Sequence, residues 1–265
     1  MEVLIAGPAG TGQSPRLSIV IPAYNEERRL GPTLHRLHEY LSAQEYRWEI
    51  VVVSNGCTDD TAGLVRRCAD EVPNLRSIDL PERGKGIASR SGALQCSGEI
   101  IFLCDADLSM PPHSLEAFLD LIETADIVVG SREAVGSKRY SEPWLRHFMG
   151  RVFNRLVQTI AVKGIEDTQC GFKALRHQAA FDLFTQQRLN GFAFDVELLY
   201  LAQKYGYRVE ELGIEWYFDD DTRVRPGIDT LGMVKELLMI RIRDSFGGYR
   251  TRATSPAPGS SDIGG

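Results

Sequence analysis

The segment from Ile100 to Asp107, IIFLCDAD, joins a fully apolar run to two carboxylates one residue apart, Asp105 and Asp107. An apolar run with polar boundaries is typical of a central strand in a parallel sheet. Ligands of open α/β sheets bind beyond the carboxyl ends of such strands. Two acids there need a cation, and hard oxygen ligands suit Mg²⁺ or Mn²⁺ carrying a nucleotide diphosphate. A turn whose acids face water is the alternative, which this motif alone does not exclude.

Four further polar positions could meet the same ligand. Backbone N–H groups where Pro22 to Glu26 lead into a helix attract phosphate or ribose oxygens. The glycines beside Lys85 let the backbone approach a phosphate, to which the lysine offers a positive charge. Arg132 ends a strand pattern with a fork that binds phosphate in a bidentate manner. Asp167 opens a second polar motif, DTQCGFK. Taken singly, each position is also compatible with an ordinary cap, turn or strand edge.

Alternating strand and helix patterns must position these residues. Strands are expected at LSIVIPAY, WEIVVVS, LRSIDL, EIIFLCD and DIVVGS, with helices over about 25–43, 58–72, 84–96 and 111–123. Such alternation predicts a parallel sheet with right-handed crossovers. The second half predicts a helix over 143–162, a short strand within 166–175, and helices near 177–186 and 193–205. A strand over 207–218 and a helix over about 229–246 follow.

Bulk properties exclude several classes of protein. The net charge of −6 gives no indication of nucleic-acid binding. Five scattered cysteines without a C-x-x-C motif indicate reduced thiols in the cytoplasm and no cysteine zinc site. No apolar stretch reaches membrane-spanning length. We expect a flexible leader over 1–15, one domain over 16–247 and a disordered tail over 248–265.

Seven motifs, in this order, resemble those of the inverting family 2 glycosyltransferases with the GT-A fold: IPAYNEE, VVVSNGCTDDT, RGKGIASRSGAL, FLCDADLS, VVGSR, DTQCGFKALR and FAFDVELLYLAQKYGYRVEE. The resemblance covers about residues 16 to 246 and is closest to the polyprenyl-phosphate (dolichyl-phosphate) glucosyl- and mannosyltransferases. DTQCGFK resembles the dolichyl-phosphate β-glucosyltransferase branch. The fold implied is a Rossmann-like α/β domain, a mostly parallel sheet flanked by helices. The reaction implied is metal-dependent, inverting transfer of a hexose, with UDP-glucose favoured as donor and polyprenyl phosphate as acceptor. The donor half would then span about residues 16–132 and the acceptor side about residues 133–247.

The resemblance also implies roles for individual residues. Asp107 would coordinate a Mg²⁺ or Mn²⁺ ion that bridges the two phosphates, with Asp105 at the ribose or a metal-bound water. The predicted donor nucleotide-binding residues are Pro22, Ala23, Tyr24, Glu26, Asn55, Lys85, Asp105 and Ala106. The predicted metal ligands are Asp105 and Asp107, and the predicted catalytic residues are Asp107, Arg132 and Asp167. The acceptor phosphate and the diphosphate are expected at Arg132, Arg146 and Arg223.

The nucleobase is less well determined by these motifs. Family members usually carry two acids before Gly56, the second of which reads the base, whereas this chain has Ser54 and Asn55. An asparagine carbonyl can accept from the uracil imide N–H, and its amide can donate to a uracil carbonyl. Uracil is therefore favoured over guanine, whose amidine face prefers a carboxylate.

The segment 143–162 predicts an amphipathic helix with an apolar stripe and basic shoulders, Arg146, His147, Arg151 and Arg155. Such a helix can lie on anionic lipid headgroups, and a core-facing helix with extended arginines is the alternative. The last helix could form a second membrane-facing surface or a homodimer. The protein is thus expected in the cytoplasm, peripheral at the cytoplasmic face of a membrane. The stripe consists of Trp144, Leu145, Phe148, Met149, Val152, Phe153, Leu156, Val157 and Ile160.

Three alternatives remain open from the sequence. The donor could be GDP-mannose. The acceptor could be a saccharide or another hydroxyl compound, with Asp167 as the general base, whereas a phosphate acceptor needs no base and would leave Asp167 to orient the sugar or the arginines. The chain could also be a catalytically silent nucleotide-binding scaffold, against which the intact Asp105, Asp107, Arg132 and Asp167 argue.

Overall fold

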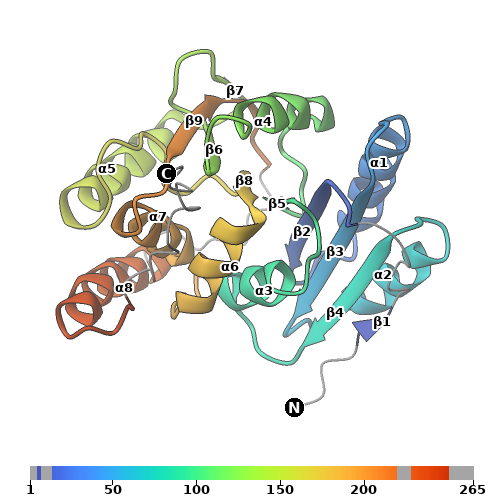
Figure 1. Ribbon diagram of the computed structural model, residues 1–265, viewed down its shortest axis with the longest axis horizontal. Coiled ribbons are helices and arrows are strands. Elements are labelled where there is room, and N and C mark those ends of the chain that lie inside the picture. Colours follow the sequence, from blue (N-terminus) through green and yellow to red (C-terminus); the bar gives the residue numbers. More distant parts are fainter. Residues whose placement is uncertain (1–4, 7–13, 220–227, 251–265) are drawn as a thin grey trace, which may run out of the picture.

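The computed structural model describes residues 5–6, 14–219 and 228–250. Its centre is an eight-stranded sheet in the order β1-β4-β3-β2-β5-β8-β6-β9, and β7 and β10 form a small second sheet (Figure 1). The strands of the large sheet are β1 (Ile5–Ala6), β2 (Leu17–Ala23), β3 (Trp48–Asn55), β4 (Leu75–Leu80), β5 (Ile100–Leu103), β6 (Ile127–Ser131), β8 (Lys173–Arg176) and β9 (Val209–Gly213). Those of the small sheet are β7 (Lys138–Tyr140) and β10 (Glu215–Tyr217), which run parallel.

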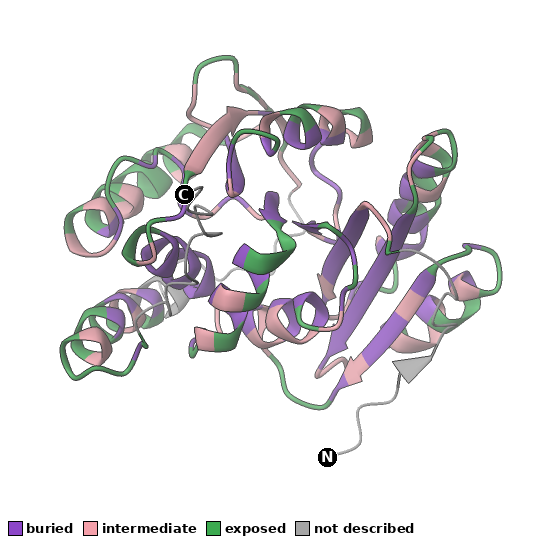
Figure 2. Ribbon diagram, in the orientation of Figure 1, coloured by how far each residue is buried: buried purple, intermediate pink, exposed green. Residues whose placement is uncertain are grey.

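Helices cover both faces of the large sheet. Alternate residues of a strand point to opposite faces, so Ile19 and Ile21 of β2 join one hydrophobic cluster and Val20 joins the other. Helices α1, α2 and α4 contribute to the first cluster, and α3, α6, α7 and α8 to the second; Figure 2 shows the buried residues concentrated in the strands. The helices are α1 (Leu30–Ser42), α2 (Thr61–Ala69), α3 (Lys85–Ala93), α4 (Leu115–Leu121), α5 (Trp144–Ile160), α6 (His177–Gln186), α7 (Phe194–Lys204) and α8 (Ile228–Ser245), with a 3₁₀ turn at Pro112–Ser114.

The strand order places the amino end of β8 at the same edge of the sheet as the carboxyl ends of its neighbours. Strands β2, β3, β4 and β5 are parallel, whereas β8 lies antiparallel between β5 and β6. Its first residue, Lys173, pairs with Leu103 of β5 and with Val129 of β6. The loop that enters β8 therefore meets the carboxyl ends of β5 and β6. The predicted α/β class and mostly parallel sheet are confirmed.

Several predicted helix boundaries were wrong because polar side chains form turns before the helices begin. The first helix begins at Leu30 rather than near Asn25, which has a left-handed backbone with φ of 54°. The second begins at Thr61 rather than Thr58, since the Asp59 carboxylate accepts from the Thr61 N–H at 3.1 Å. The third helix differs from the prediction at its other end, because it ends at Ala93 instead of Cys96.

Strand predictions failed where long-range pairing decides the structure. Of the strand expected within 166–175, only Lys173–Arg176 forms, and the preceding residues are a loop. The strand expected over 207–218 is divided at Ile214 into β9 and β10, and β7 was not predicted. Within the range expected to be a flexible leader, Ile5–Ala6 pairs antiparallel with β4. Among the helices described, none is both long and apolar enough to cross a membrane.

Candidate active site

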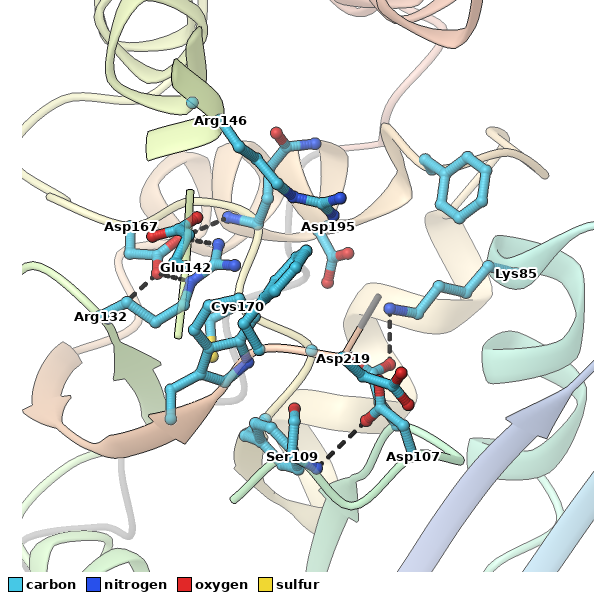
Figure 3. A pocket seen from close by; sticks show the side chains of 18 of the residues that line it. Lys85, Asp107, Ser109, Arg132, Glu142, Arg146, Asp167, Cys170, Asp195 and Asp219 are labelled. Carbon is cyan, nitrogen blue, oxygen red and sulfur yellow. Dashed lines mark hydrogen bonds and ion pairs between the residues drawn. The ribbon is translucent and has the colours of Figure 1, made fainter. Parts of the chain in front are cut away.

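A pocket of about 930 Å³ lies at the carboxyl edge of the sheet and extends to α5 (Figure 3). Its volume is in the range of ligand-binding cavities, about 300–1,000 Å³. It brings together all the sequence-predicted site residues within the described part of the chain except Ala23, which is wholly buried in β2. Arg223 lies outside the described residues.

The two carboxylates after β5 form the donor end of the pocket. Lys85, at the start of α3, approaches Asp105 with 2.7 Å between Nζ and Oδ1. Burial alone would raise the pKa of Asp105, but the Lys85 ammonium outweighs it and keeps that pKa below its ordinary value. Burial, and then the negative charge of Asp105, raise the pKa of Asp107. Two crowded carboxylates of this kind favour a cation beside them.

The carboxylate oxygens of Asp105 and Asp107 suit a hard divalent metal ion that also binds a substrate. Within residues 5–6, 14–219 and 228–250, no three acidic, histidine or cysteine side chains form a metal cage. Mg²⁺ is usually bound through one or two carboxylates together with phosphate oxygens and water. Asp105 and Asp107 match this pattern, whereas a site made by protein side chains alone does not exist in the described part.

Gly171 permits the close approach of the β8 entry loop to the donor end. A Cβ atom at this position would lie 2.0 Å from Oδ2 of Asp105. Any larger residue would have to displace the Asp105 carboxylate. The loop is thus packed closely against the Asp105 carboxylate.

Arg132 and Asp167 form the other end of the pocket. The Asp167 carboxylate accepts hydrogen bonds from the backbone N–H, Nε and an Nη of Arg132, at 3.0, 2.6 and 2.9 Å. Although burial favours the neutral acid, the guanidinium lowers the pKa of Asp167 to about 2. Such a carboxylate is a poor proton acceptor near neutral pH. The geometry therefore disfavours Asp167 as a general base and gives it the role of holding Arg132.

Apart from Ala23, the predicted nucleoside-binding residues line the pocket, but two of them are bound by other groups of the protein. The Asn55 amide donates to the Ala23 carbonyl at 2.9 Å and accepts from the Gly84 N–H at 2.9 Å. Asn55 thus joins the end of β2 to the loop of Lys85, instead of presenting a free amide to a base. Glu26 is paired with Arg29 at 2.8 Å.

Tyr24 and Arg83 form the remaining wall at this end. The Arg83 guanidinium lies over the Tyr24 ring, 4.1 Å from its centroid. Both side chains line the pocket. A flat, cation-stacked aromatic ring is a suitable surface for a nucleobase.

Helix α5 divides its apolar stripe between the core and solvent. Val157 is wholly buried, and Phe153 and Ile160 pack on the same core cluster, whereas Trp144 is 77% exposed. The helix is therefore core-facing along part of the stripe only. The basic shoulders are partly neutralised, because Arg151 pairs with Glu133 at 3.2 Å and with Glu166 at 3.5 Å. The exposed apolar residues are Trp144, Leu145, Phe148, Met149, Val152 and Leu156, of which Leu145 and Met149 also line the pocket.

Lys173 and Asp195 were missed by the sequence prediction. Lys173 is fully buried and donates to Asp195 Oδ1 at 2.5 Å and to the Cys170 carbonyl. Asp195 lines the pocket from the first turn of α7. The available signal was an acid inside the otherwise apolar FAFDV, which an ordinary helix start also explains.

The fold and the pocket are those of an α/β transferase that uses a nucleotide sugar. The chain belongs to glycosyl transferase family 2, whose model matches residues 18–184. Its sequence is also similar to those of individual enzymes. It is 35% identical to the dolichyl-phosphate beta-glucosyltransferase ALG5C of Trichomonas vaginalis, over 91% of this chain and 75% of that protein. It is 34% identical to the dolichyl-phosphate beta-glucosyltransferase of Mus musculus, over 91% of this chain and 80% of that protein.

Solved structures share the fold. Glucosyl-3-phosphoglycerate synthase from Mycobacterium tuberculosis, in complex with Mn²⁺ and UDP-glucose, superposes with a TM-score of 0.62 at 18% identity, covering 88% of this chain and 79% of that one. The mannosyltransferase PcManGT from Pyrobaculum calidifontis, in complex with GDP-Man and Mn²⁺, gives 0.57 at 19% identity, covering 89% and 65%. The predicted GT-A fold is confirmed.

Proposed function

We propose that this enzyme transfers glucose from UDP-glucose to the phosphate of a polyprenyl lipid such as dolichyl phosphate. The Arg132–Asp167 pair carries the proposal. A hydroxyl acceptor needs a group that removes its proton, and the paired Asp167 cannot easily do so. A phosphate acceptor is already anionic and needs a cation, which Arg132 supplies. The names of the relatives at 32–35% identity agree with this substrate class.

The donor would bind at the carboxyl edge of the sheet. Asp105 and Asp107 would hold a Mg²⁺ or Mn²⁺ ion, which when bound would neutralise charge on the leaving diphosphate. Lys85 lies beside Asp105 and would add a second positive charge at the phosphates. Tyr24 would support the base, while Pro22, Glu26, Asn55 and Ala106 shape the pocket around the nucleoside.

The acceptor phosphate would bind between Arg132 and Arg146. Both line the pocket, and the Arg146 guanidinium lies 4.8 Å from the centroid of the Phe218 ring. Attack from this side, in line with the leaving diphosphate, would invert the anomeric carbon and give a β-linked product from an α-linked donor. Positioning and charge complementarity would supply most of the rate.

The lipid part of the acceptor would remain in a membrane on which α5 lies. The exposed apolar face of α5 borders the same pocket, so a lipid phosphate could enter without its chain leaving the bilayer. We place the enzyme peripherally, at the cytoplasmic face of a membrane. A homodimer through the exposed residues of α8 is a separate prediction, which light scattering on the purified protein tests.

A transfer assay tests the function. Purified protein is incubated with polyprenyl-phosphate vesicles, Mn²⁺ and labelled UDP-glucose or, in parallel, GDP-mannose. We expect label from UDP-glucose in an organic-extractable, mild-acid-labile lipid. Labelling of the lipid only from GDP-mannose would show that GDP-mannose, and not UDP-glucose, is the donor. Metal-dependent release of UDP without lipid labelling would favour a hydroxyl acceptor, and binding of nucleotide sugar without turnover on any acceptor would favour the silent scaffold.

A further inference from the structure

Asp195 presents a buried carboxylate to the pocket. The residue is 3% exposed, and Lys173 holds its Oδ1 at 2.5 Å. Within the described part of the chain, Oδ2 has no hydrogen-bond partner, although Asp195 lines the pocket. Figure 3 shows the side chain pointing into the pocket. This oxygen is open to the pocket, because Asp195 is not among the described residues whose buried polar atoms lack a partner. A ligand that donates hydrogen bonds can therefore reach it.

Asp195 lies between the two ends of the pocket. Figure 3 shows the group around Lys85 and Asp107 on one side of Asp195 and the Arg132–Asp167 pair on the other. Asp195 is also close enough to Lys85 for its charge to contribute to the raised pKa of that lysine. In an in-line transfer the hexose must lie between the leaving diphosphate and the attacking phosphate. In the proposed reaction the hexose would therefore lie beside Asp195.

We infer that Asp195 accepts hydrogen bonds from hydroxyl groups of the transferred hexose and determines which hexose is used. This inference rests on the proposed function. An ionised carboxylate binds hydroxyl donors strongly, and a site built for a particular hydroxyl rejects analogues that lack it. Lys173 is the positioning residue, because its ammonium group holds Oδ1 of the carboxylate. The other explanation is a buried ion pair that only stabilises the fold.

Calorimetric binding without lipid separates these two explanations. UDP and UDP-glucose are titrated, with Mn²⁺, into the wild-type protein and into Asp195→Asn. We expect UDP to bind both proteins alike, which also shows that the variant is folded. UDP-glucose should lose about tenfold or more in affinity in the variant, as for a lost hydrogen bond to a charged group. Equal changes for both ligands, or no change, would overturn the inference.

A second variant covers the case in which Asp195→Asn does not fold. Asp195→Glu keeps a charge for Lys173 but moves the carboxylate by one methylene. We test it with UDP-glucose analogues that lack one hydroxyl each at C2, C3, C4 or C6. In the wild type, one of these analogues should bind much more weakly than UDP-glucose. In Asp195→Glu, the affinities for that analogue and for UDP-glucose should differ much less. An unchanged order of affinities would contradict a role in sugar recognition.

The same titrations distinguish a failure of this inference from a wrong assignment of the donor. GDP and GDP-mannose are measured in parallel with the uridine pair. If only the guanosine pair binds the wild type, the proposed donor is wrong, and the Asp195 comparison is made on that pair. If neither hexose adds affinity over the bare nucleotide in the wild type, Asp195 has no sugar to recognise and the inference fails.

Discussion

Arg132 donates to Asp167 through its backbone N–H and through two guanidinium nitrogens, although the two residues are 35 positions apart in the chain. This relationship joins the end of β6 to the loop that enters β8. It fixes the direction of the guanidinium, whose second Nη has no hydrogen-bond partner among the residues that the structure describes. Asp167, which the sequence allows as a general base, is in the structure bound to the Arg132 guanidinium.

Replacing Asp167 by asparagine should impair acceptor binding without changing the dependence of rate on pH. We expect transfer to fall by about 10²-fold, as for the loss of one preorganised charged contact, chiefly through the KM of the lipid phosphate. Kinetics from about pH 5 to 9 check this. Glu166→Gln, a change at the exposed neighbouring acid, is the control. An acidic limb in the wild-type kcat that disappears in Asp167→Asn would mean that Asp167 is a base after all.

The same pair predicts how stability depends on pH. The pKa of Asp167 is lowered from 3.8 to about 2, so its contribution is complete above about pH 4 and is lost as the pH falls through about 2. At neutral pH, Asp167→Asn should lower the free energy of unfolding by about 2 kcal/mol or more. Urea unfolding at several pH values should show the two proteins converging below pH 4. A constant difference down to pH 2 would contradict the assigned ion pair.

Gly171→Ala should damage donor binding through Asp105. The added Cβ would lie 2.0 Å from Asp105 Oδ2, so the carboxylate must move. We expect the Mn²⁺-dependent affinity for UDP to fall by about tenfold, a cost of about 1–3 kcal/mol being usual for overpacking. Gly150→Ala is a matched control, because nothing lies within 4 Å of its new Cβ. If Gly171→Ala binds UDP as well as the wild type, the loop can yield without disturbing Asp105.

The fold was largely readable because each strand carries a local pattern. All eight residues of β3 are buried, and the apolar run before Asp105 marked a central strand from the sequence alone. The hydrogen-bond partners of Asn55 and Asp167 were not readable, because they lie far along the chain. For Asp167 the sequence left open a general base or a group that orients the sugar or the arginines. The place of β8 was equally hidden, since a strand of four residues carries no information about which strands it pairs with.

Phe148→Glu should release the enzyme from membranes. Phe148 is 59% exposed on α5. Burying such a ring contributes about 1.5–3 kcal/mol, so affinity for anionic vesicles should fall by about tenfold or more in a flotation assay. Phe181→Glu on α6 is the matched control, since Phe181 is 54% exposed. Equal losses in both variants would show a general effect of added charge and not a membrane-binding face.

β8 also determines how the chain can be divided. It comes from the range expected to form the acceptor side, yet it lies between β5 and β6 of the range expected to form the donor half. A fragment that ends near residue 132 would leave both neighbours with an open edge, and unpaired strand edges promote aggregation. Exchanging the two ranges between relatives as consecutive fragments would make β8 of one parent pair with β5 and β6 of the other. Chimeras should instead graft the residues around the pocket while keeping β5, β8 and β6 from one parent.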